Sequence, residues 1–318
     1  MAARMAAQEY YVGLGSGRDD IHVEDTHDAR TPNVENPFHI EVRFLGGLTN
    51  EQKKAFVTAA NKWASVIVGD LVNVQLPDGT IIDDVRIDAA GVLINGPGHV
   101  LGRAGPTEFR PPEAGKQALL PFAGGMEFDV DDIPRMIDDD LWDDVILHEM
   151  GHVIGMLDRV WSPKGFVRFK GILGKWSFVG PTAMAEFGKL QDPSSNQALA
   201  DAAKGGGGQG VPVPIEDNFG PGTIGSHWRE SVFGAEMMTG FVNPGNNPLS
   251  RVTGGALADI GYQVDLDACD PYSLPSSTEL AMLGVLSAAR LNDTGIFGDY
   301  IEHTVPRVAP ASVLRING

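Results

Sequence analysis

Hydrophobic and charged side chains alternate near the start of the chain. Residues 40–45 read Ile-Glu-Val-Arg-Phe-Leu, a period of two that predicts a strand with one buried face. From residue 56 to residue 67 the apolar positions change to helical spacing. Thr49 and Gln52 match a capping box at the beginning of this helix, and Gly69 is expected to end it. A strand that leads into a helix is the start of an α/β or α+β unit.

Further extended segments predict that this strand belongs to a twisted mixed sheet. They are residues 71–76, 81–87, 92–95 and 126–130, and the turn sequence Pro-Asp-Gly at 77–79 separates the first two. After Gly155 the patterning weakens into chain rich in Gly, Pro and Ser, and the four glycines at 205–208 predict a loop. Two helices are expected later, at residues 250–260, where Gly261 would end the helix, and at 278–291.

A longer apolar pattern covers residues 140–157. It predicts a mostly buried helix, because the apolar residues close into one broad face: Leu141, Val145, Ile146, Leu147, Met150, Val153, Ile154 and Leu157. Acidic residues at its beginning suit the positive end of the helix dipole: Asp138, Asp139, Asp140, Asp143 and Asp144. Neither this cluster nor the one at 129–132 has the alternating ligands of a calcium loop, so we interpret both as solvated helix starts.

This helix carries the sequence His148-Glu149-Met150-Gly151-His152. Residues four apart lie on nearly the same helix face, about 6 Å apart along the axis, so both imidazoles can point at one metal ion. Zinc bound by neutral nitrogens lowers the pKa of its water to roughly 7, and a neighbouring carboxylate such as Glu149 can take that proton. The motif therefore predicts a zinc-dependent hydrolase.

Composition limits the partners of the protein. The formal charge of −18 and the pI near 4.7 argue against nucleic acid and anionic membranes, and no cluster of Lys and Arg offers a phosphate-binding surface. No apolar run approaches the roughly 20 residues that span a bilayer. No signal peptide is visible in residues 1–20. Cys269 is the single cysteine, so no internal disulfide is possible, and we expect a buried thiol without a catalytic role.

The sequence offers two candidates for the third ligand of the metal. Asp158 lies six positions after His152, where many metzincin peptidases place their third ligand in the arrangement His-Glu-x-x-His-x-x-Gly-x-x-His. The other candidate is His227, within Gly-Ser-His-Trp-Arg-Glu at 225–230, which is followed by Glu-Met-Met-Thr-Gly at 236–240.

These later motifs resemble the leishmanolysin family of metzincins. In that family the helix ends at the glycine, a long insertion follows, and a histidine in a similar context completes the site. The resemblance covers roughly residues 38–274. Its further motifs are Phe44 to Leu71, Asn-Gly-Pro-Gly at 95–98, the run at 101–106, Leu-Ser-Arg-Val-Thr at 249–253 and Leu-Ala-Asp-Ile-Gly-Tyr at 257–262.

The resemblance implies a ligand set and a reaction. His148, His152 and His227 would bind zinc, Glu149 would be the general base, and Met238 would form the hydrophobic floor of the site in a Met-turn. The implied activity is that of a metalloendopeptidase acting on peptide or protein substrates, with an extracellular or secreted location. Leishmanolysin has many disulfides and a blocking cysteine in its propeptide, whereas this chain has no cysteine before Cys269, so we expect no such latency.

The expected organisation is an α+β, metzincin-like unit. Residues 1–37 would be a polar arm and residues 275–318 an extension. Between them, an N-terminal lobe of about 38–157 would hold the twisted mixed sheet and two long helices, and an irregular C-terminal lobe of about 158–274 would face it across the cleft. Two alternatives stay open: a zinc-stabilised binding or adhesion module without turnover, and a short-spaced metzincin that uses Asp158 as third ligand.

Overall fold

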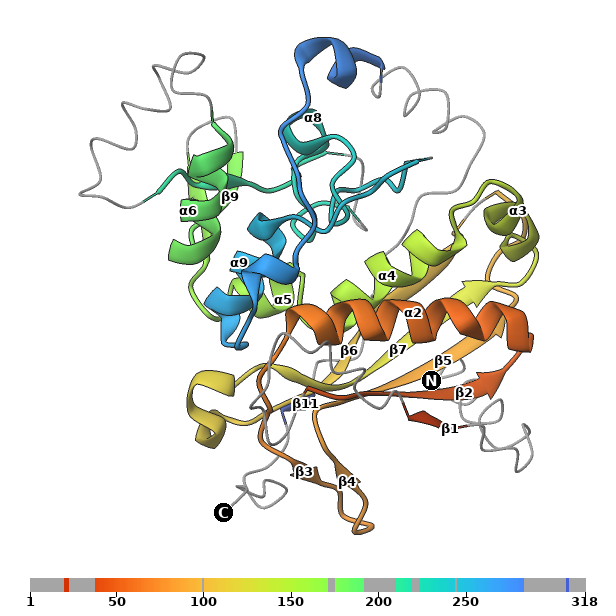
Figure 1. The fold of residues 1–318 in the computed structure, drawn as a ribbon. Coiled ribbons are helices and arrows are strands. Elements are labelled where there is room, and N and C mark those ends of the chain that lie inside the picture. The colour runs from red at the N-terminus through yellow and green to blue at the C-terminus, as the bar shows by residue number, and fades with distance from the viewer. Residues whose placement is uncertain are drawn as a thin grey trace.

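The computed structural model describes residues 20–22, 38–98, 100–170, 175–191, 210–218, 223–243, 245–282 and 307–308. Within these residues the protein is an α+β structure in which helices cover one face of a twisted mixed sheet (Figure 1).

Among the described residues, the largest sheet has six strands in the order β1-β2-β5-β7-β6-β11 (Figure 1). Its strands are β1 (Asp20–His22), β2 (Ile40–Gly46), β5 (Val85–Val92), β7 (Pro121–Asp129), β6 (Gly102–Phe109) and β11 (Arg307–Val308). Strands β2, β5 and β7 are parallel, whereas β1 and β6 are antiparallel to β2 and β7. Strand β11 pairs with β6 in parallel. The expected mixed sheet is therefore present, and β6 is a strand that the sequence patterns had not indicated.

Helices α2 (Asn50–Val66) and α4 (Trp142–Val153) lie side by side on one face of this sheet (Figure 1). The capping box of Thr49 and Gln52 is formed as expected, and α2 ends at Val66, earlier than Gly69. The indole Nε1 of Trp63 donates a hydrogen bond of 3.0 Å to the carbonyl of Leu147. This bond fixes α4 against α2 immediately before the first histidine of the motif.

The helix that carries the motif is shorter than the sequence pattern predicts. It begins at Trp142, because Asp138 ends the preceding helix α3 (Ile133–Asp138) and Asp140 adopts a positive φ of 57° in the turn. Asp143 and Asp144 do occupy the first turn of α4. The assignment of residues 138–140 to this helix is therefore wrong, since two short helices with a turn between them share one acidic run.

Two of the three aspartates at 129–132 are buried and not solvated as expected, whereas Asp131 is exposed. Asp129 is fully buried, and its Oδ2 accepts hydrogen bonds of 3.0 Å from the backbone N–H groups of residues 94–96. Asp132 is also buried and accepts a bond of 2.8 Å from the N–H of Gly98. Both carboxylates hold the loop after β5, which is why they face inward.

The chain after Gly155 is more regular than the sequence patterns predict. Up to Cys269, its described elements are α5 (Asp158–Trp161), β8 (Val167–Lys170), β9 (Lys175–Phe178), α6 (Pro181–Leu190), β10 (Val213–Pro214), α8 (Glu230–Phe233), α9 (Arg251–Ile260) and η2 (Leu266–Ala268). Strands β10, β9 and β8 form a small sheet in that order. Helix α9 is the expected helix at 250–260, capped by Ser250 and ended by Gly261.

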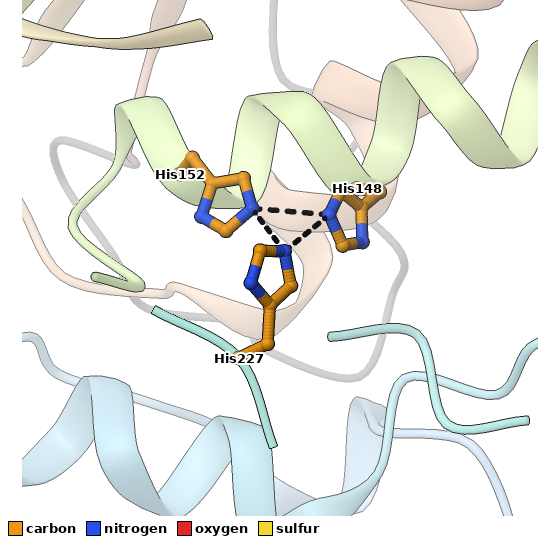
Figure 2. A group of neighbouring side chains, drawn as sticks. All are labelled: His148, His152 and His227. Carbon is orange, nitrogen blue, oxygen red and sulfur yellow. Dashed lines mark hydrogen bonds between the residues drawn. The ribbon is translucent and has the colours of Figure 1, made fainter. Parts of the chain in front are cut away.

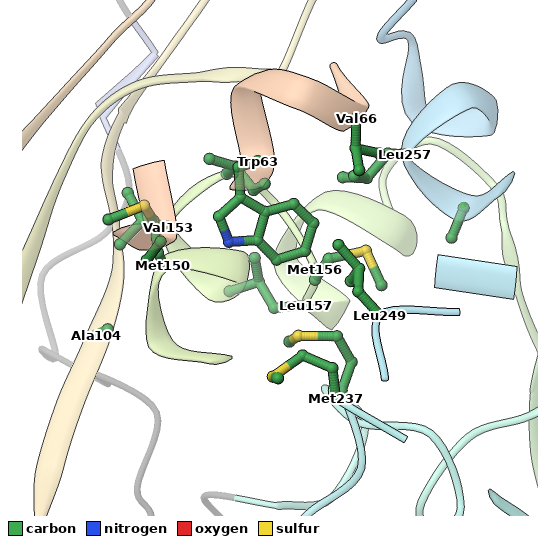
Figure 3. Close-up of a cluster of buried hydrophobic side chains, with 14 of the residues drawn as sticks. Trp63, Val66, Ala104, Met150, Val153, Met156, Leu157, Met237, Leu249 and Leu257 are labelled. Carbon is green, nitrogen blue, oxygen red and sulfur yellow. The ribbon is translucent and has the colours of Figure 1, made fainter. Parts of the chain in front are cut away.

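One hydrophobic core joins the early helices to this later chain. Trp63 lies among Met150 and Met156 from the region of α4 and Leu249 and Leu257 from around α9 (Figure 3). All five side chains are fully buried. Packing of this kind fixes the position of the later segments relative to α4.

The remaining expected segments are described in part. The Pro-Asp-Gly turn at 77–79 joins β3 (Val74–Gln75) to β4 (Ile81–Ile82), as expected. Of the expected arm at 1–37, residues 20–22 form β1, and of the helix at 278–291, residues 278–282 are helical. The other residues of both segments, and the glycines at 205–208, lie outside the described residues. Among the described residues, no helix combines the length and apolar character that a bilayer crossing requires.

Candidate metal centre

Helix α4 places His148 and His152 one turn apart on its buried face. Their exposed fractions are 1% and 0%. Gly155 then turns the chain away from the helix with a φ of 113°, a conformation in which a side chain would be strained. The N–H of Gly155 bonds to the carbonyl of His152 at 3.1 Å and the N–H of Met156 bonds to that of Gly151 at 3.0 Å. These two bonds are those of a Schellman motif, so the glycine ends α4 directly after its second histidine.

His227 comes to the same point from a distant part of the sequence. Its Nε2 lies 3.1 Å from the Nε2 atoms of both His148 and His152, and those two atoms are 3.0 Å apart (Figure 2). The three rings thus direct the same nitrogen towards one point. The described residues contain this buried triad of possible metal ligands, and Asp158 is not part of it.

Backbone carbonyls determine which nitrogen of each ring carries the proton. The Nδ1 atoms of His148, His152 and His227 lie 2.7, 2.7 and 3.0 Å from the carbonyl oxygens of Met237, Met156 and Thr223. A carbonyl oxygen can only accept, so each Nδ1 is the donor, and in the neutral imidazole Nε2 is left with its lone pair. All three lone pairs therefore face one another.

This donor set fits a metal ion. A tetrahedral zinc ion about 2.0–2.1 Å from each nitrogen would hold its ligands roughly 3.3 Å apart, close to the observed separations. Burial lowers the pKa of His148 to about 3 and that of His152 to about 4, so both rings are neutral, as metal ligands must be. Three converging lone pairs repel one another unless a cation lies between them. The buried cluster is therefore able to hold a metal ion.

Glu149 occupies the position between the two helical histidines. Its side chain is 1% exposed, so a carboxylate is buried in the same turn of α4 as the two imidazoles. A carboxyl group in a buried site is expensive to ionise unless a positive charge or hydrogen bonds compensate. A metal ion in the triad would supply such a charge.

Met238 packs against α4 at Gly151, between the two helical histidines. An added Cβ on Gly151 would approach the Sδ of Met238 to 2.7 Å, so the thioether touches the helix between the two histidines. Met238 is 1% exposed and its neighbour Met237 supplies the carbonyl that binds His148. The residues of the expected Met-turn therefore lie next to the triad.

Two buried glutamates, Glu216 and Glu236, hold the chain around His227, and neither role was expected from the sequence. Glu216 accepts backbone hydrogen bonds from Asp217, Asn218 and Glu230, and its own N–H donates 2.8 Å to the carbonyl of His227. Glu236 accepts four hydrogen bonds, one from Met238, two from Ser250 and one from Thr253. Their positions beside the two motifs were visible in the sequence, but nothing there indicates burial.

Asp158 and Cys269 lie away from the converging nitrogens. Asp158 begins α5 and accepts a hydrogen bond from the hydroxyl of Ser162, beside the turn at Gly225. Cys269 packs against Gly254 of α9, and burial raises the pKa of its thiol to about 12. Neither residue contributes an atom to the triad.

No protein-family model matches the chain, and no curated protein is found as a relative. The residues of the site and their geometry are therefore the basis on which a function can be inferred.

Proposed function

We propose that the protein is a zinc-dependent endopeptidase of the leishmanolysin-like metzincin type. The observation that supports this most is the convergence of His148, His152 and His227 through Nε2, with every Nδ1 held by a backbone carbonyl. Three protein ligands leave a fourth position open, as in catalytic zinc sites, whereas structural sites are closed by four. Imidazole nitrogens favour zinc over calcium or magnesium.

In this proposal each residue has a defined task. The three imidazoles hold the ion, and bound zinc would supply a Lewis acid that polarises the scissile carbonyl and acidifies a water molecule. The carboxylate of Glu149 would take up a proton from water and deliver it to the leaving amine. Met238 supports the site through its contact with α4. An edge of the mixed sheet would pair with an extended substrate.

The alternative is a zinc-stabilised binding module without turnover. Such a module needs no buried carboxylate beside its ligands, so the presence of Glu149 favours the peptidase. The short-spaced metzincin is disfavoured, because Asp158 is outside the triad and His227 is within it.

The proposal is tested by the metal content and the activity of the purified chain. We expect one zinc ion per molecule, hydrolysis of internally quenched peptides, loss of hydrolysis with a chelator and recovery with added zinc. Bound zinc with no hydrolysis across a broad peptide library would favour the binding module. Hydrolysis that continues in metal-free protein would contradict the proposal.

A further inference from the structure

A closed ring of hydrogen bonds lies directly behind the triad. The N–H of Trp228, the residue after His227, donates to the carbonyl of Met238 at 2.9 Å. The N–H of Met238 donates to Oε2 of Glu236 at 2.6 Å. On the other side, Nε1 of Trp228 donates to the hydroxyl of Thr253 at 2.8 Å, and that hydroxyl donates to Oε1 of Glu236 at 2.5 Å. The ring closes at Glu236, because one of its carboxylate oxygens binds Met238 and the other binds Thr253.

Glu236 is also one peptide group away from His148. The peptide between Met237 and Met238 donates its N–H to Glu236 and accepts, through its carbonyl, the Nδ1–H of His148 at 2.7 Å. Hydrogen bonds that share a peptide group polarise one another. A negative charge on Glu236 therefore strengthens the bond that orients His148 and makes its imidazole a better donor to a cation.

Burial raises the pKa of Glu236, and the hydrogen bonds that its two oxygens accept oppose this shift and favour the ionised carboxylate. Glu236 is fully buried, and besides Met238 and Thr253 it accepts bonds from the N–H and the hydroxyl of Ser250 at 3.1 and 2.7 Å. Four donors around two oxygens suit an acceptor with no proton of its own. A dication held by three neutral imidazoles is a buried positive charge, which a nearby fixed anion stabilises.

We propose that Glu236 is a positioning residue of the metal centre, which orients His148 through the Met237–Met238 peptide and His227 through Trp228 and so sets the metal affinity of the triad. The inference rests on the metal-binding part of the proposed function. Glu236 touches none of the ligands directly, and its effect passes through the ring of hydrogen bonds.

The test compares Glu236→Gln with Asp129→Asn. Asp129 is equally buried and also accepts four hydrogen bonds, all from backbone N–H groups, but it holds the loop after β5. Each substitution removes one buried carboxylate. If Glu236 had only a structural role, the two variants should therefore show similar changes in thermal stability and in zinc affinity. Zinc affinity is measured by chelator competition, the ligand geometry by the visible absorption of the cobalt(II) form, and stability by thermal unfolding of the metal-free protein.

We expect Glu236→Gln to weaken zinc binding about 10- to 100-fold and to alter the cobalt(II) spectrum. Asp129→Asn should leave both unchanged even where it lowers the melting temperature. Equal zinc affinity in the Glu236 variant and the parent protein would overturn the proposal, as would a parent protein that binds no zinc. If Glu236→Gln is not recovered folded, Thr253→Val takes its place as the test, because it removes the hydroxyl from the ring of hydrogen bonds. Weaker zinc binding in this variant would support the proposal, and unchanged zinc binding would overturn it.

The outcome is separate from that of the proposed function. Zinc binding without peptide hydrolysis in the parent protein defeats the peptidase and leaves the role of Glu236 open to this comparison. Hydrolysis with zinc affinity independent of Glu236 defeats the inference alone.

Discussion

Gly151 and Met238 face each other at a distance that leaves no room for a methyl group. A Cβ on Gly151 would lie 2.7 Å from Sδ of Met238 and 2.9 Å from Cζ2 of Trp63. Two residues far apart in the sequence are thus matched in size beside the histidine triad, and the helix can approach Met238 only because position 151 carries no side chain.

The first prediction follows from this contact. Gly151→Ala should destabilise the metal-free protein by about 1–3 kcal/mol, because Met238 or Trp63 must shift inside a filled core. Gly188→Ala is the matched control, since a Cβ there would lie 3.8 Å from its nearest neighbour, in ordinary contact. Alanine in a helix is favoured over glycine, so the control should be neutral or slightly stabilising. Chemical denaturation measures both, and a Gly151 variant as stable as its control would contradict the packing argument.

The second prediction concerns the proposed general base. Glu149→Gln should keep zinc and lose nearly all hydrolysis of an unfolded protein substrate, because the amide fills the same space but cannot accept a proton. Metal analysis and a peptide assay on the same preparation separate the two effects. Unchanged turnover in this variant would rule out the mechanism.

The third prediction distinguishes the ligands. His227→Ala should lower zinc affinity by orders of magnitude and abolish hydrolysis, because it removes one of the three nitrogens. Asp158→Ala should retain bound zinc and at least part of the activity, since its carboxylate binds Ser162 instead. The reverse pattern, with zinc lost only from the Asp158 variant, would indicate that Asp158 is the third ligand, as in the short-spaced metzincin.

The fourth prediction concerns the pH dependence of stability. In the folded metal-free protein burial lowers the pKa of His148 to about 3 and that of His152 to about 4, from 6.5. Below about pH 6.5 the unfolded chain therefore binds more protons than the folded protein. The free energy of unfolding is unaffected by these two rings above that pH and decreases as the pH falls towards about 4. One pKa unit corresponds to about 1.4 kcal/mol, which makes the loss several kcal/mol in order of magnitude.

Thermal unfolding of metal-free protein between about pH 8 and pH 4 measures this loss. His152→Gln, which has no titrating ring, should show a smaller decrease than the parent protein. A melting temperature that stays constant as the pH falls through 6 would contradict the buried neutral state of the rings.

The fifth prediction concerns the single cysteine. Cys269→Ser should leave hydrolysis almost intact, because the thiol packs against Gly254 and lies outside the triad. Since burial raises the pKa of this thiol to about 12, alkylation at neutral pH should be slow in the folded protein and fast after unfolding. A large loss of activity with the fold preserved would indicate a role that the structure does not show.

The sequence predicted correctly those elements that are determined by interactions among residues close together in the chain. The capping box at Thr49, the alternation in β2 and the glycine after α9 each act over one turn or one strand, and each is present. The pairing of His148 with His152 is equally local, since helix geometry alone places them together. The arrival of His227 depends on chain folding back over a long segment, and the sequence motif could suggest it only through family resemblance.

The features that were missed depend on burial, which composition does not reveal. Asp129 and Asp132 lie in an acidic run that resembles a solvated surface, yet both point inward to bind a loop. Strand β6 contains Gly and Pro among its residues, so it lacks the apolar alternation by which β2 was recognised. Helix α6 is short and follows chain rich in glycine, and it is held by the carboxylate of Asp259, which accepts the N–H groups of Thr182 and Ala183.

The orientation of the three histidines has a consequence for how the site tolerates mutation. Their Nδ1 atoms bind carbonyls of Met237, Met156 and Thr223, which belong to the main chain and would be present whatever side chain stood there. Substitution at these three positions can therefore leave the proton on the correct nitrogen. For His152 and His227, whose carbonyls lie only four residues away, inserting or deleting a single residue in between would move the acceptor out of reach. Over evolutionary drift, the spacing of these segments should be preserved more strictly than their composition.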